Sequence, residues 1–120
     1  MSYLAFLEQA HLMGVEYRQT PHILSTEDHE ERRARLEEHR ARLREVFGPF
    51  RHSCQVAAVD ARSSAARANC DRVFAASRMV YMALGDIAEG VSDTSVFYVA
   101  LDHYWSAVTE LGEAMRLEEP

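Results

Sequence analysis

The residues best able to do chemistry in this sequence are six histidines and two cysteines. Glu8 and His11 form one Glu-x-x-His pair, whereas helical di-iron sites need two such pairs and further glutamates. Asp102 and His103 are neighbours, so on a helix their side chains point about 100° apart and chelate one ion poorly. We therefore expect no metal centre and no cofactor, with a metal hydrolase built on Glu8, His11 and His103 as an alternative.

Arg33 and His39 are separated by five residues. This spacing resembles the Arg-x4–6-His signature of HEPN-type ribonucleases, which are helical dimers. The resemblance covers two residues, and it implies that Arg33 and His39 would act together on an RNA phosphate at a dimer cleft. Against it stands the formal net charge of −6, because nucleic-acid binders are normally basic. We expect nucleic acid not to be the partner.

The two cysteines, Cys54 and Cys70, lie sixteen residues apart in what the sequence predicts to be one helix. That separation corresponds to about 24 Å, whereas the Cα atoms of a disulfide lie within about 7 Å. We expect two free thiols that lie on apolar faces and pack in the core. Free thiols of this kind are typical of proteins in a reducing compartment.

Composition places the chain among single-domain globular proteins, with one domain over residues 1–120. All 13 basic residues are arginine, which indicates a GC-rich bacterial or phage genome. The first residues lack a basic segment, and Glu8 interrupts their apolar run, so they do not resemble a signal peptide. No apolar run approaches the roughly 20 residues that span a bilayer. We expect a cytoplasmic protein without a membrane partner.

Apolar residues recur at three- and four-residue steps, with only five glycines and three prolines, so the fold class is all-α. The pattern predicts an up-and-down bundle of about four helices with one long central helix. The predicted helices cover residues 2–18, 26–47, 50–89 and 93–117. Gly48-Pro49 is taken as the end of the second helix.

The predicted helix over residues 50–89 carries apolar stripes on two opposite faces, and at about 60 Å it is much longer than a compact domain of this size. Two apolar faces need two packing layers, which favours a second copy of the chain and a two-fold symmetric dimer. The residues predicted at that interface are Ala57, Ala61, Ala65, Ala68 and Met79. Two alternatives remain open: a monomeric bundle that wraps this helix on both sides, and a break near Ser63 or Asn69.

Two further clusters have both structural and functional interpretations. The aromatic residues Tyr98, Tyr104 and Trp105 could line a pocket for a small apolar ligand, although such residues at helical spacing usually form core. Six arginines between Arg32 and Arg44 could bind phosphate or an acidic partner, but the seven acidic residues nearby favour a solvated helix with paired charges.

No set of residues assembles a catalytic centre, so we expect a protein that is not an enzyme. The leading hypothesis is a bundle that acts through self-association and contact with a protein partner. A binder of a small apolar ligand is the alternative, followed by the ribonuclease or metal hydrolase.

Overall fold

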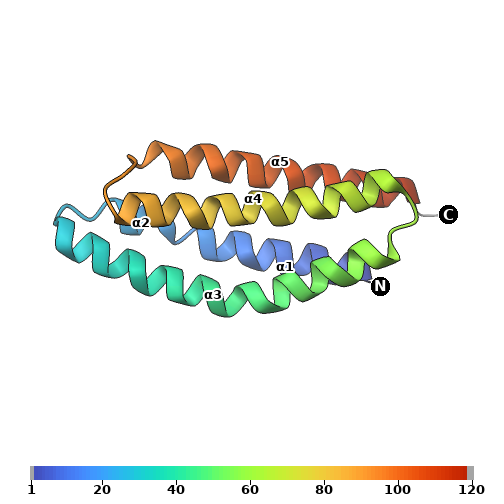
Figure 1. Ribbon diagram of the computed structural model, residues 1–120, viewed down its shortest axis with the longest axis horizontal. Helices are drawn as coiled ribbons and strands as arrows, with labels where there is room; N and C mark the ends of the chain where they lie inside the picture. Colours follow the sequence, from blue (N-terminus) through green and yellow to red (C-terminus); the bar gives the residue numbers. More distant parts are fainter. Residues whose placement is uncertain (1, 119–120) are drawn as a thin grey trace.

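The computed structural model describes residues 2–118. In this part of the chain four long helices form an up-and-down bundle, and a fifth, short helix lies in one of the connections (Figure 1). The helices are α1 (Ser2–Tyr17), α2 (Thr20–Leu24), α3 (His29–Asp60), α4 (Ser64–Ala88) and α5 (Ser95–Glu118). The four long helices run along the longest axis of a body measuring 53 × 23 × 18 Å. Contacts join α1 to α3, α3 to α4, α4 to α5, and α5 back to α1, which closes the bundle around one core. The predicted fold class is therefore confirmed.

The predicted helix boundary at Gly48-Pro49 is wrong, because α3 continues through Pro49 to Asp60. Proline in a helix interior costs about 3 kcal/mol, since it lacks an N–H group and its ring crowds the carbonyl of residue i−4. Here that carbonyl belongs to Glu45, and both Glu45 and Pro49 are exposed, so water can hydrate the freed oxygen. Figure 1 shows α3 curving along its length, as expected of a helix with an internal proline.

The predicted single helix over residues 50–89 is also wrong, because the chain breaks at residues 61–63 and turns back. Ala61 is extended, with a ψ angle of 128°, and Ser63 caps the next helix, its Oγ accepting a hydrogen bond of 3.0 Å from the Ala66 N–H. Serine is a favoured N-cap because its side chain satisfies a free N–H group of the first turn. The helices α3 and α4 therefore form an antiparallel hairpin and pack against each other.

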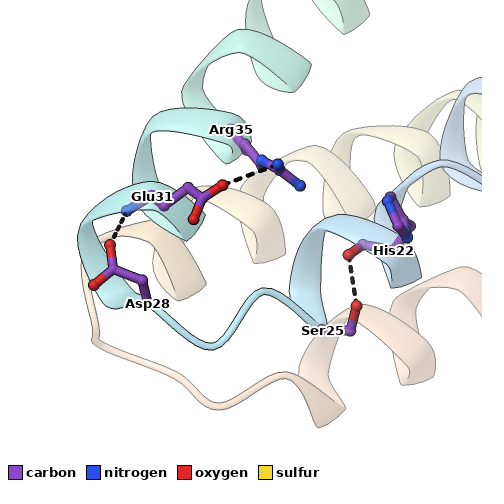
Figure 2. Close-up of polar contacts among 5 residues, drawn as sticks. All are labelled: His22, Ser25, Asp28, Glu31 and Arg35. Atoms are coloured by element: carbon purple, nitrogen blue, oxygen red, sulfur yellow. Dashed lines mark hydrogen bonds and ion pairs between the residues drawn. The ribbon is translucent and has the colours of Figure 1, made fainter.

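The turn before α3 is held by short polar contacts (Figure 2). Asp28 is the N-cap of α3 and accepts a hydrogen bond of 2.9 Å from the Glu31 N–H. Glu31 in turn pairs with Arg35 one turn later at 2.9 Å. The short helix α2 lies in what the sequence predicted as a connection, and at its end the Ser25 hydroxyl donates to the His22 carbonyl at 2.7 Å.

The core is formed by one stripe from each long helix, with residues repeating every three, four or seven positions. Its fully buried large side chains are Phe6, Met13 and Tyr17 of α1, Leu36, Leu43 and Phe50 of α3, Val73, Val80 and Leu84 of α4, and Phe97, Tyr104 and Leu111 of α5. The two buried tyrosines keep their hydroxyl groups hydrogen-bonded: Tyr17 with Ser77 Oγ at 2.6 Å, and Tyr104 with the Ala10 carbonyl.

The two cysteines, predicted to lie about 24 Å apart, are close together because the turn at residues 61–63 folds α4 onto α3. The Cys54 thiol donates to the carbonyl oxygen of Cys70 at 3.5 Å, and both cysteines are buried and in the reduced form. Burial raises the pKa of Cys54 to about 12, so the protonated thiol predominates at neutral pH and nucleophilic reactivity is suppressed.

Candidate functional site

The outer side of α4 exposes apolar side chains that no other helix covers. We define the α4 outer face as Ala65, Ala68, Arg72, Ala75, Met79, Met82 and Asp86, all of which are exposed. Met79 and Met82 are the largest of its apolar residues, and 59% and 56% of their surfaces face solvent. Exposed methionines are flexible and polarisable, and they are common on surfaces that bind other proteins. Gathered on one helix, these side chains mark a candidate contact surface.

Beside this face lies an apolar groove between α4 and α5, with a volume of about 560 Å³. Met79 and Met82 line it from α4, and Val96 and Val99 line it from α5. Val99 is itself 58% exposed. The α4–α5 groove and the α4 outer face thus form one continuous apolar surface.

Charged side chains lie on this surface on either side of Met79. Asp86 lies at the end near the α4–α5 connection. On the other side of Met79, Arg72 of α4 and Glu110 of α5 form an ion pair of 2.9 Å, with both side chains more than half exposed. Exposed pairs of this kind stabilise a fold by at most about 1 kcal/mol, so the Arg72 guanidinium remains available to a partner.

The predicted interface residues divide into two groups. Ala57 and Ala61 are buried against the rest of the chain, at 0% and 7% exposure, so their assignment to a free surface is wrong. The reason is the break at residues 61–63, which places Ala57 of α3 and Ala61 at its end inside the bundle. Ala65, Ala68 and Met79 follow the break and are exposed. Val99 was not among the predicted interface residues, because no pattern in α5 shows which of its sides meets α4.

The three aromatic residues predicted to line a ligand pocket have different surroundings. Tyr104 is fully buried, and its ring meets the Tyr17 ring edge-on at 5.4 Å. Trp105 is half-buried and packs on Gly14, where a Cβ atom would lie only 2.2 Å from the indole ring. Tyr98 is exposed at 44% and contacts Phe97. None of the three lines the α4–α5 groove.

Arg33 and His39, which together resemble the ribonuclease signature, do not face one another. Six helical residues turn the chain through about 600°, which leaves their side chains about 120° apart. Arg33 is exposed, whereas His39 is buried and its Nε2 atom pairs with the Thr20 hydroxyl at 2.7 Å. His39 therefore ties α2 to α3, and Arg33 and His39 are not brought into one cleft.

Because His39 is buried, we expect the protein to lose stability in mild acid. Desolvation lowers the pKa of His39 below the usual 6.5. Two charged neighbours have smaller effects: Glu16 raises the pKa and Arg42 lowers it. The folded state thus binds a proton less readily than the unfolded chain, so stability is complete above pH 6.5 and falls as the pH drops through the lowered pKa. Urea denaturation from pH 7.5 to about 5 will show the midpoint falling in the wild type.

The matched control for this prediction is His103→Gln, which changes an exposed histidine and should keep the acid-dependent fall. His39→Gln should remove most of it between these pH values. An identical fall in His39→Gln would assign the acid sensitivity to other groups.

The residues considered for a metal site do not converge. His11 is exposed on α1, where its Nδ1–H donates to the Leu7 carbonyl at 2.8 Å. His103 lines the α4–α5 groove instead. Within residues 2–118 no three histidine, cysteine, aspartate or glutamate side chains are grouped to hold a metal ion.

The arginine run on α3 is paired mainly with acidic and aromatic groups. Arg35 pairs with Glu31, and Arg42 pairs with Glu16 of α1 at 3.0 Å. Arg40 lies over the Tyr81 ring, 4.6 Å from its centroid, which is a cation–π contact. These contacts fit the interpretation of a solvated helix whose charges are matched locally.

Comparison with known proteins gives no relative from which a function could be transferred. No protein-family model, curated protein or solved structure matches this chain. None of the helices within the described residues is long and apolar enough to span a bilayer. The surface of α4 and α5 is therefore interpreted from its own geometry.

Proposed function

We propose that this protein is a non-enzymatic helical bundle that acts through protein–protein contact and that it self-associates through the α4 outer face. The observation that carries this proposal is the exposure of Met79, Met82 and Val99 beside one apolar groove. Single exposed apolar residues are ordinary on protein surfaces, but a continuous apolar surface with a polar rim is typical of an interface. From Ala65 to Asp86 the face spans about 32 Å of helix.

The interface proposed here differs from the one predicted from the sequence. The idea of a rod with two apolar faces no longer supports a dimer, because the rod does not exist. Support comes instead from the predicted interface residues that remain exposed, Ala65, Ala68 and Met79, all of which lie on α4. Homodimers are the commonest symmetric assemblies, so a second copy is the simplest partner.

A small apolar ligand in the α4–α5 groove is the second candidate function. The groove's volume of about 560 Å³ lies within the range of known ligand pockets. Ligand pockets enclose most of their ligand, however, whereas Met79, Met82 and Val99 leave more than half of their surfaces to solvent. The open shape of the groove favours a protein partner.

The test of self-association is Met79→Glu. We expect the wild type to dimerise in sedimentation velocity, and we expect the variant to weaken the dimer at least about a hundredfold, because two unpaired carboxylates would be buried at the interface. The matched control is Val59→Glu, which places the same charge at an 81% exposed apolar position on α3. A monomeric wild type at all concentrations, or equal dimers of wild type and Met79→Glu, would contradict the proposal.

A further inference from the structure

We propose that the second copy docks antiparallel on the α4 outer face, with the two-fold axis beside Met79 and Arg72 of each copy opposite the partner's Asp86. This inference rests on the proposed self-association and specifies its geometry. Arg72 and Asp86 each lie seven residues from Met79, on opposite sides of it along α4. Seven residues correspond to about 10.5 Å along the axis and a turn of about 20° from the direction of Met79. A two-fold axis at Met79 therefore places Arg72 of each copy opposite Asp86 of the other copy.

Side-chain size follows the same symmetry. Met82 and Ala75 lie about 60° and 40° from Met79 on the same side of the helix, at nearly equal distances before and after it along the chain. An antiparallel partner thus presents its own Ala75 to Met82, so a large side chain meets a small one. Ala76 and Ala83 lie on the other side, towards α5, and line the groove. On the outer face the exposed Ala75 is small enough to let the two α4 helices approach to the short end of the 8–10 Å packing range.

Electrostatics distinguish this arrangement from a parallel one. In a parallel two-fold dimer Asp86 would face the partner's Asp86, and Arg72 would face the partner's Arg72. Like charges at such short range destabilise an interface, whereas complementary charges select its register and orientation. With a net charge of −6, two copies also repel one another over long range, so opposite charges at the contact matter more than usual. The antiparallel dimer places two opposite-charge pairs at this interface.

The test is a charge exchange between two variants, Arg72→Glu and Asp86→Arg. Alone, each variant would pair like charges twice per dimer, and we expect each to dimerise about tenfold more weakly than the wild type at low salt. Mixed in equal amounts, the two variants would form a heterodimer in which both contacts again join one acidic and one basic side chain. We expect sedimentation velocity to show this heterodimer with an affinity within about threefold of the wild type. High salt should reduce the difference between single variants and wild type.

One control concerns Glu110, because Arg72 also pairs with it inside the chain. Glu110→Gln should leave dimerisation unchanged, which separates the loss of that ion pair from the contact between copies. Thermal denaturation by circular dichroism checks that each variant is folded.

Three results are decisive. Recovery of the dimer in the mixture, and only there, supports the antiparallel register. Failure of the mixture to recover, or single variants as tight as the wild type, overturns the register while Met79→Glu still tests the surface. A wild type that stays monomeric overturns both the register and the proposed function.

Discussion

Replacing Phe50 by alanine is expected to lower the free energy of unfolding by about 3–5 kcal/mol, the usual cost of removing a buried aromatic ring. Phe50 has no exposed surface. Its ring lies 5.5 Å from Phe6 of α1, 5.8 Å from Phe47 of α3 and 6.2 Å from Phe74 of α4. One ring therefore joins three helices, and its loss leaves a cavity that none of the three can close without moving the others. Urea denaturation of wild type and variant measures the difference.

The control for Phe50 is Val59→Ala on the same helix, at a position 81% exposed. Its effect should stay within about 0.5 kcal/mol, as for most surface substitutions. Both variants are best compared in the Met79→Glu background, so that association does not add to the measured stability. A loss below about 1 kcal/mol for Phe50→Ala would mean that this ring is not held in a packed core.

Phe50 also explains why the sequence predicted the wrong helix boundary. Gly48-Pro49 is a strong local signal for a helix end, and proline costs about 3 kcal/mol inside a helix. The residues after it, Phe50, Cys54 and Ala57, continue the buried stripe of Leu36 and Leu43 at the same helical phase. Burying Phe50 alone contributes about 1.5–3 kcal/mol, which is close to the penalty at Pro49, and the burial of Cys54 and Ala57 adds to it, so the three together favour extending the helix. Local rules alone cannot make that comparison, because they do not include the partners of Phe50.

The first and last long helices could be predicted well, because each is amphipathic with one apolar stripe. The predicted ranges 2–18 and 93–117 differ from α1 and α5 by no more than two residues at either end. The middle of the chain could not be predicted in the same way. The Arg62-Ser63-Ser64 segment is a weak break signal, and apolar residues continue on both sides of it.

The two apolar stripes of the helix predicted over residues 50–89 are divided between two helices, α3 and α4. Before the break, the stripe that contains Phe50, Cys54 and Ala57 is buried, whereas Val59, which belongs to the stripe on the opposite face, is exposed. After the break, the buried residues come from that other stripe, as in Cys70 and Val73. The turn formed by the three residues between α3 and α4 thus changes which of the two stripes faces the core. Exposed methionines on α4 could be anticipated from the sequence, but the groove beside them depends on how α5 packs.

Ala57→Glu is expected to destabilise the protein by about 3–5 kcal/mol or more, whereas Ala68→Glu should change its stability by less than about 0.5 kcal/mol. Ala57 has no exposed surface where α3 packs into the bundle, so a glutamate there would bury an unpaired charge. Ala68 is exposed on the α4 outer face, where the same side chain stays in water. Urea denaturation in the Met79→Glu background compares the two, and Ala57→Leu provides a smaller, measurable loss if Ala57→Glu does not fold.

This pair of alanines separates the hairpin from a continuous rod. In one unbroken helix residues 57 and 68 would lie eleven positions apart and only about 20° apart around the axis. The two substitutions would then meet the same surroundings and have similar effects. In the hairpin of α3 and α4 the turn at residues 61–63 places one alanine inside and the other outside. Equal effects of Ala57→Glu and Ala68→Glu would contradict the fold on which the α4 outer face depends, and unequal effects of the expected size would support it.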